Sequence, residues 1–261
     1  MKLLYMLPDE VRAAQARRVP LVIPAGTIAY HSAHCALGCD SLIVEGLLDQ
    51  LAAQKEIVIA PTIYYGPSSY AVSGPEKGTI HVDVDHFERY VYDILKGFLY
   101  AGWRSVYVVI HDQFENETLL PMSLCFLKPA RQLTFEFLEE TLGRGWWGRE
   151  ENAQFYDQLG EEENPWNWIN VLPAMSAQAQ QATGYDHAGK WESSLLMALY
   201  PKAVDLGGLN GKQEWYARSA REATPELGRR MIQAALTALG DRIKSGTPPV
   251  ASHTPAKELI T

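Results

Sequence analysis

Residues 30–40 of the chain, YHSAHCALGCD, place two histidines, two cysteines and one aspartate within eleven positions. All of these side chains can bind a metal ion, through imidazole nitrogen, thiolate sulfur or carboxylate oxygen. The same segment could instead be a redox site built on the cysteines, or a polar loop without chemistry. A zinc finger is disfavoured, because no second pair of ligands follows at the spacing of such a domain.

Two later segments carry residues of the same kinds. IHDQFENE at 110–117 and GYDHAGKWESS at 184–194 are rich in histidine and carboxylate side chains. The segments at 30–40 and 110–117 each follow a predicted buried strand, and 184–194 opens a predicted helix. Ligands of doubly wound α/β proteins bind beyond the carboxyl ends of the strands. We therefore expect the three segments to meet at one edge of a sheet.

Apolar strands alternate with amphipathic helices along the chain, and this pattern predicts a three-layer α/β/α domain around a mostly parallel sheet. Asp40 is expected to cap the helix that follows it. The expected strands are 20–26, 56–61, 105–110, 169–173 and a short one after residue 78, and the expected helices are 41–54, 84–100, 190–201 and 225–244.

Composition and charge narrow the class of protein. The chain has 261 residues, a net charge of −8 and three cysteines. This length fits one α/β domain over 1–245, followed by a loose C-terminal tail at 246–261. The negative charge disfavours nucleic-acid partners, and no apolar run is long enough to predict a membrane span. The few cysteines disfavour a disulfide framework, so we expect a cytoplasmic protein.

The segment 143–168 is unusual, because it holds four of the seven tryptophans among acidic residues and glycines. One interpretation is a solvated loop whose tryptophans cover a neighbouring element. The other is an aromatic lid over a pocket, or a contact between subunits. On the lid interpretation, Trp166 and Trp168 are candidate substrate contacts.

The order and spacing of these segments resemble the creatininase family of metal-dependent amidohydrolases. The first motif of that family has the form P-x-G-x-x-E-x-H-G-x-H-x-x-x-x-x-D. The residues that match it without a gap are Pro24, Gly26, His31, His34 and Asp40. DHAGKWESS at 186–194 is close to the family's Asp-x-His-Ala-Gly-x-x-Glu-Thr-Ser, which is its most specific part. Weaker similarity at 61–69 and 223–229 extends the resemblance over residues 18–243.

The resemblance implies a layered fold, a homohexamer, and two divalent ions (Zn or Mn) that share a bridging aspartate. His31, Asp40 and Glu115 stand at the positions of the second ion's ligands. His187 stands at the family's catalytic histidine, and Glu192 at its partner carboxylate.

The segment PTIYYGPSS at 61–69 resembles the family's Pro…Tyr-Gly-x-Ser segment. Ser68 either contacts substrate or caps a turn. Tyr65 either lines the cavity or packs beside it. Both are kept as candidate substrate contacts.

The chain departs from the family at two positions, and both departures affect the first ion. The glutamate of the motif is replaced by Ala29, whose side chain cannot bind a metal. The loop histidine is displaced because the loop is one residue longer, so its place falls on Asp112 or Gln113, with His111 beside them. These three residues and His34 are candidate substitute ligands. We therefore expect one Zn or Mn ion per chain.

Two functions are compatible with this pattern. The first is a metal-dependent hydrolase in which metal-bound water attacks a cyclic amide or a related small carbonyl compound. His187 would then move the proton, and Glu192 would orient His187 or hold substrate. The second is a non-hydrolytic binding or assembly protein that kept the fold and lost dinuclear catalysis. Ala29 favours the second function, whereas the presence together of His31, Asp40, Glu115 and the His187–Glu192 pair favours an enzyme.

Overall fold

A parallel sheet forms the centre of the molecule. The structure is a computed structural model, and it describes residues 1–112, 121–210 and 214–244. Within these ranges the sheet has four strands in the order β2-β1-β3-β4, and every pair is parallel. The strands are β1 (Leu21–Ala25), β2 (Val58–Ile59), β3 (Val106–Ile110) and β4 (Ile169–Pro173). The prediction of a mostly parallel sheet is confirmed.

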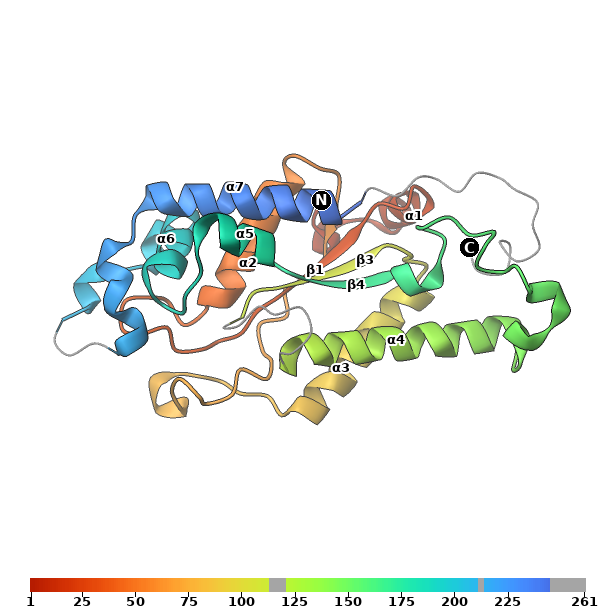
Figure 1. The fold of residues 1–261 in the computed structure, drawn as a ribbon, viewed down its shortest axis with the longest axis horizontal. Coiled ribbons are helices and arrows are strands. Elements are labelled where there is room, and N and C mark those ends of the chain that lie inside the picture. The colour runs from red at the N-terminus through yellow and green to blue at the C-terminus, as the bar shows by residue number, and fades with distance from the viewer. Residues whose placement is uncertain (113–120, 211–213, 245–261) are drawn as a thin grey trace.

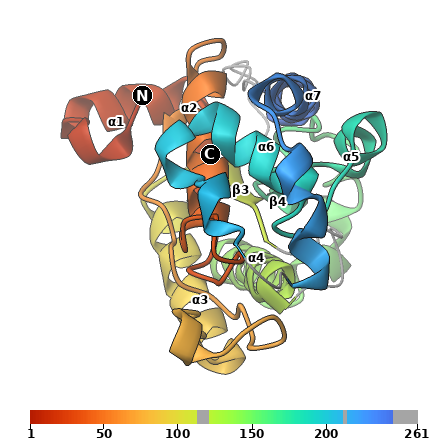
Figure 2. The same ribbon diagram turned by 90° about the vertical axis from the view of Figure 1, so that its left-hand side faces the viewer.

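Helices cover both faces of this sheet, as Figures 1 and 2 show. Helices α3 and α4 lie on one face, and α2, α5, α6 and α7 lie on the other. The bounds of the α-helices are α1 Pro8–Ala16, α2 Cys39–Ala52, α3 Val84–Tyr100, α4 Pro121–Leu142, α5 Ala177–Thr183, α6 Lys190–Leu199 and α7 Pro225–Arg242. Short 3₁₀ helices lie at Leu3–Tyr5, Pro75–Lys77, Trp146–Gly148, Glu150–Asn152, Pro165–Asn167, Pro201–Ala203, Leu206–Gly208 and Trp215–Glu222.

Two hydrophobic cores result, one on each side of the sheet. Successive strand residues point to opposite faces. Leu21 and Ile23 of β1 therefore pack with α3 and α4, while Val22 packs with α2, α6 and α7. Because both faces are covered, β1 and β3 are buried along their whole length. This explains why these strands are continuous apolar runs in the sequence.

The helix at 84–100 is confirmed as α3. Its buried residues recur at every fourth position, and Asp83 caps its N-terminus by accepting hydrogen bonds from the N–H groups of Asp85 and His86. The short strand expected just before it is absent from the described residues 78–83. Only one backbone hydrogen bond, from Ile80 N–H to Ile28 C=O (2.9 Å), ties that segment to the loop after β1.

The predicted C-terminal tail at 246–261 lies outside the described residues, and the division into one domain and a tail stays a prediction. No α-helix within the described parts of the chain combines the length and apolar character needed to span a lipid bilayer.

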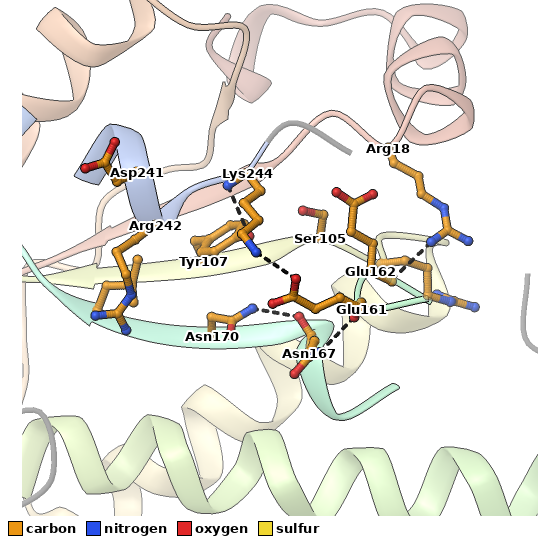
Figure 3. Close-up of a pocket in the computed structure, with 12 residues that line it drawn as sticks. Arg18, Ser105, Tyr107, Glu161, Glu162, Asn167, Asn170, Asp241, Arg242 and Lys244 are labelled. Carbon is orange, nitrogen blue, oxygen red and sulfur yellow. Dashed lines mark hydrogen bonds and ion pairs between the residues drawn. The ribbon is translucent and has the colours of Figure 1, made fainter. Parts of the chain in front are cut away.

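A cavity of about 250 Å³ lies at the amino ends of β3 and β4, beside the end of α7 (Figure 3). Its lining is rich in charged and amide side chains that bond to one another or to backbone. Lys244 Nζ pairs with Glu161 Oε2 at 2.8 Å, and Arg18 donates to the Glu162 carbonyl oxygen at 3.1 Å. No histidine or cysteine lines this cavity.

Helices α6 and α7 pack with their backbones in close contact. A Cβ atom on Gly228 of α7 would lie 1.9 Å from the Ser194 carbonyl oxygen of α6 and 2.6 Å from Ala198 Cβ. Only glycine fits at this position.

We therefore expect Gly228→Ala to lower the free energy of unfolding by about 1–3 kcal/mol or more, because the helices must separate to admit the methyl group. Gly240→Ala is the matched control, since it is in the same helix and its Cβ would meet nothing within 4 Å. The control should raise stability by about 0.5–1 kcal/mol through helix propensity. Urea unfolding of both variants gives the comparison, and equal effects would contradict this account of the packing.

Candidate metal centre

Five ionisable side chains meet at the carboxyl edge of the sheet. His31 lies in the loop after β1, and Asp40 lies in the first turn of α2. His111 directly follows β3, while His187 and Glu192 come from the segment that opens α6. The expectation that the three segments meet at one edge of the sheet agrees with these positions. Four of the five side chains are at most 2% exposed, and His187 is 10% exposed.

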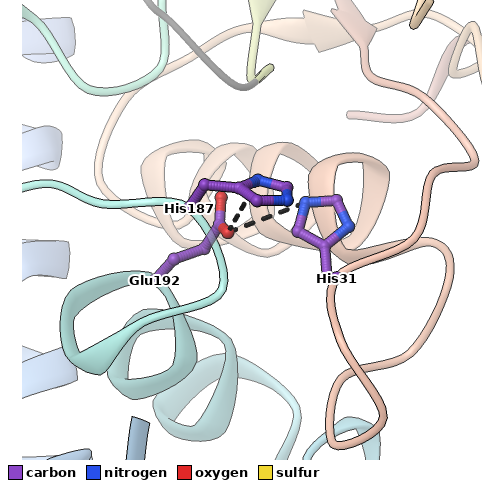
Figure 4. A group of neighbouring side chains, drawn as sticks. All are labelled: His31, His187 and Glu192. Carbon is purple, nitrogen blue, oxygen red and sulfur yellow. Dashed lines mark ion pairs between the residues drawn. The ribbon is translucent and has the colours of Figure 1, made fainter. Parts of the chain in front are cut away.

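Glu192 is at the centre of this cluster. Its Oε1 lies 3.1 Å from His111 Nε2, and its Oε2 lies 3.6 Å from His31 Nε2 and 3.8 Å from His187 Nδ1. Figure 4 shows His31 pointing from the loop after β1 toward His187 and Glu192, which come from the segment that leads into α6 and from the start of that helix. Three imidazoles therefore surround a single carboxylate that solvent does not reach.

The start of α6 is built to hold Glu192 in this place. Asp186 accepts hydrogen bonds from the N–H groups of Trp191 (3.1 Å) and Glu192 (3.0 Å). The Ala188 N–H donates to Glu192 Oε2 at 2.6 Å, and Ala188 has a left-handed φ of 52°. Gly189 is required, since a Cβ there would lie 2.2 Å from Asp186 Oδ2. Asp186 thus caps the helix and positions the carboxylate.

Asp40 forms the second acidic part of the cluster. Its Oδ1 lies 3.1 Å from His31 Nε2, and Thr27 donates its hydroxyl to Oδ2 at 2.5 Å. The expectation that Asp40 caps the following helix is wrong. The helix begins at Cys39, two residues before the expected start, with Gly38 at the N-cap position, and Asp40 is inside its first turn. Its carboxylate bonds to Thr27 and His31 instead.

The loop that carries His31 has an uncommon backbone conformation. Ser32, at the position where the family motif has glycine, adopts a left-handed φ of 61°. Its hydroxyl donates to Glu214 Oε2 at 2.9 Å, and the same carboxylate accepts from Tyr30 (3.0 Å) and Lys77 (3.1 Å). Serine is therefore accommodated at a strained position where its side chain gains a hydrogen bond.

The charges of the cluster are strongly coupled. Burial alone would lower the pKa of His31, but the carboxylates of Asp40 and Glu192 raise it to about 10. Burial would raise the pKa of Glu192, but the nearby imidazoles, His31 foremost, lower it to about 2. Burial and the charge of His31 both lower the pKa of His187. Two buried carboxylates thus require positive charge at this point.

Two overlapping groups of side chains are arranged as metal ligands often are. His31, His187 and Glu192 form one group, and Asp40, His111 and Glu192 form the other. Within each group the ligand atoms all lie within 4.8 Å of one another. Imidazole nitrogen together with carboxylate oxygen suits Zn²⁺ and Mn²⁺. Glu192 belongs to both groups, a position that its sequence context did not predict.

The other candidate ligands are placed as follows. His34 is buried but belongs to neither group, because its Nε2 bonds to the Ser193 hydroxyl at 2.8 Å. Asp112 lines a small pocket beside the cluster, together with Ala29, His31 and His187. Gln113 and Glu115 lie outside the described residues.

The candidate substrate contacts fall in different places. Ser68 lines the small pocket beside the cluster, whose volume of about 10 Å³ suits a single water molecule. Tyr65 lies in a separate cavity between the loop at 62–65 and α3. Trp168 is 2% exposed and packs against Phe137 at the amino end of β4. Trp166 lies near it, in contact with Phe135, so neither tryptophan is near the cluster.

The fold and the site together define a three-layer α/β protein with a buried histidine–carboxylate cluster at the carboxyl edge of a parallel sheet. The family model for creatininase (creatinine amidohydrolase) matches residues 5–243. The chain therefore belongs to the creatininase family.

Individual relatives are distant but extend over nearly the whole chain. Creatinine amidohydrolase from Pseudomonas putida is 21% identical over 254 residues, covering 88% of this chain and 90% of the relative. A solved structure named creatininase Mn has a TM-score of 0.68 at 19% identity, covering 95% of this chain and 99% of its own. A mutant creatininase of Zn–Zn type has a TM-score of 0.66 at 18% identity, covering 95% and 98%. The three-layer fold is confirmed.

Proposed function

We propose that this chain is a metal-dependent hydrolase that acts on a cyclic amide or a related small carbonyl compound, with one Zn²⁺ or Mn²⁺ per chain. The observation that carries the proposal is the buried Glu192 carboxylate among three imidazoles, beside the second carboxylate of Asp40. Membership in the creatininase family supplies the class of reaction.

The donor set fits a divalent cation. Asp40, His111 and Glu192 provide two carboxylates and one imidazole, all at most 1% exposed. Two negative charges balance one dication, whereas the group of His31, His187 and Glu192 has only one. We therefore assign the ion to the group of Asp40, His111 and Glu192. Glu192 would then serve as a ligand in place of the glutamate of the family motif, whose position is occupied by Ala29 in this chain. Glu115, which the sequence places among the ligands, stays a prediction.

A divalent ion at this place would polarise a carbonyl group and make a water molecule more acidic. His187 would move the proton. Neither of its ring nitrogens has a hydrogen-bond partner among the described residues, and its lowered pKa leaves it neutral near pH 7. A neutral imidazole can accept a proton from water and give it to the leaving nitrogen. Thr27 and Asp186 would hold the two carboxylates in position.

Metal content and hydrolysis together test the proposal. The purified chain is expected to retain about one Zn or Mn ion after dialysis and to hydrolyse at least one member of a panel of creatinine, hydantoins and small lactams. A chelator should abolish this hydrolysis, and added metal should restore it. Two ions per chain would contradict the single-ion assignment. Absence of bound metal, with no thermal stabilisation on adding it, would contradict the hydrolase.

The alternative is a binding or assembly protein that kept the fold without hydrolysis. Ala29 favours it, because this position has no metal-binding side chain. It predicts a folded protein that gains no hydrolytic activity with any added divalent ion. Family resemblance further leads us to propose a homohexamer, which light scattering after gel filtration tests, and a cytoplasmic location.

A further inference from the structure

The cavity at the amino ends of β3 and β4 lies at the opposite edge of the sheet from the candidate metal centre. Tyr107, the second residue of β3, lines the cavity, whereas His111 directly follows the other end of that strand. Four residue steps of extended chain separate Tyr107 from His111, which is about 13 Å. The cavity is therefore a separate site, and its volume of about 250 Å³ gives room for a small molecule.

Arg18, which lines the cavity, occupies a backbone position that usually belongs to glycine. It follows the C-terminal end of α1 with a left-handed φ of 52°. The Arg18 N–H donates to the Gln15 carbonyl oxygen at 2.9 Å. The next N–H, that of Val19, donates to the Ala14 carbonyl oxygen at 2.9 Å. These two bonds form a Schellman motif, in which a side chain at the left-handed position costs conformational energy. An arginine there indicates a function for its guanidinium group.

Arg104 brings a second guanidinium group to the same cavity. The group packs against two aromatic rings, with its central carbon 4.9 Å from the ring centre of Phe137 and 4.8 Å from that of Trp168. Its Nη1 donates to the carbonyl oxygens of Leu99 at 2.7 Å and Trp103 at 3.2 Å. A guanidinium group has five N–H donors in one plane, so Arg104 can bind an oxyanion while these contacts fix its position.

The cavity carries an excess of positive charge. Among the described residues that line it, four are basic and three are acidic. Lys244 and Glu161 pair with each other at 2.8 Å, as Figure 3 shows, and Arg18 donates to the main-chain oxygen of Glu162 at 3.1 Å. Burial, and then the charge of Arg18, lowers the pKa of Arg104 to about 10. The two guanidinium groups therefore repel each other, and an anion between them would relieve the repulsion.

We propose that this cavity binds a small oxyanion, a carboxylate or a phosphate, through the guanidinium groups of Arg18 and Arg104. Planar guanidinium groups bind both kinds of oxyanion with pairs of parallel hydrogen bonds. The backbone conformation of Arg18 and the aromatic contacts of Arg104 hold the two groups in place before the anion arrives. The inference stands or fails independently of the proposed hydrolysis, because it uses the other edge of the sheet.

The test measures the binding of inorganic phosphate and of succinate to the full-length chain by isothermal titration calorimetry. Ionic strength is held constant, because salt screens the attraction between exposed charges. We expect saturable binding of at least one of the two anions with a dissociation constant below about 1 mM. Tighter binding of phosphate or of succinate identifies the kind of oxyanion. Absence of saturation with either anion up to about 10 mM would refute the proposal.

Two neighbouring arginines supply a matched pair of variants. Arg18→Gln should weaken binding at least about tenfold. Arg17→Gln should leave binding unchanged, since Arg17 is exposed and pairs with Glu56 at 2.9 Å outside the cavity. Equal weakening in both variants would mean that only net charge acts, and the site would be ruled out. Treatment with a chelator should leave the affinity unchanged, whereas loss of binding would place the anion at the metal centre instead.

Arg18→Gly separates anion binding from folding. Glycine suits the left-handed position, so the variant without anion should unfold at the same temperature as the unmutated chain or at a higher one. The anion raises the unfolding temperature of the unmutated chain if it binds the folded state, and this rise should disappear in the variant. A variant that keeps the full rise would show that Arg18 does not bind the anion.

Discussion

Replacing Glu192 with glutamine is expected to remove the metal ion from the protein. The carboxylate belongs to both candidate groups of ligands and is the shared partner of His31, His111 and His187. Glutamine keeps the shape but has no negative charge. We expect the metal content per chain to fall from about one to about one-tenth or less. Elemental analysis after dialysis measures the change.

The same substitution should destabilise the metal-free protein. His31 is buried, and the carboxylates of Glu192 and Asp40 raise its pKa above the usual value despite the burial. Removing one partner of a buried charge pair costs about 3–5 kcal/mol. Glu45→Gln is the matched control, since Glu45 is a partly buried carboxylate on α2 that accepts from Thr62 and Tyr64 at 2.6 Å each. If Glu192→Gln retains its metal as the control does, Glu192 is not a ligand.

Much of the placement of the site could be predicted from sequence, because topology requires it. The runs at β1 and β3 are apolar on both faces, which is typical of parallel strands covered by helices. Parallel strands end at the same edge of their sheet. Ligand-type residues that follow such strands must therefore gather there, as His31 and His111 do. His187 and Glu192 join them because α6 packs above the same edge.

The central position of Glu192 could not be predicted in this way. It depends on the capping by Asp186, on the left-handed φ of Ala188 and on the close packing of α6 against Gly228. These are tertiary features without a local signal of their own. The role of Asp40 could not be predicted from its neighbours in sequence either. The local pattern is typical of an N-cap, but the carboxylate accepts a hydrogen bond from Thr27, thirteen positions earlier.

Two other differences between the sequence-based predictions and the structure have identifiable physical causes. The sequence did not predict α4, which spans 22 residues with Pro129 inside it, because an interior proline normally ends a helix. The tryptophan-rich segment was open to two interpretations, and Trp168 fits the one in which aromatic rings cover a neighbouring element. It packs against Phe137 and under the guanidinium of Arg104, whose centre lies 4.8 Å from the indole.

Replacing His187 with asparagine is expected to lower kcat/KM by a factor of about 10²–10⁴ while the protein keeps its metal. The reason is that His187 is proposed to move a proton and not to bind the ion. The substrate is the panel member that the unmutated chain hydrolyses. His86→Asn is the matched control, because His86 lies on α3 with its side chain 81% exposed, and it should change neither activity nor metal content.

The pH profile separates this role from a structural one. Burial lowers the pKa of His187 below its usual value of 6.5, so the ring is neutral and able to accept a proton near pH 7. In the unmutated protein, kcat/KM should fall as the pH drops through a value below 6.5, because protonated His187 cannot act as a base. That acid limb should disappear in His187→Asn, leaving a low, flat rate. Loss of the ion from this variant would instead place His187 among the ligands, in the group with His31 and Glu192.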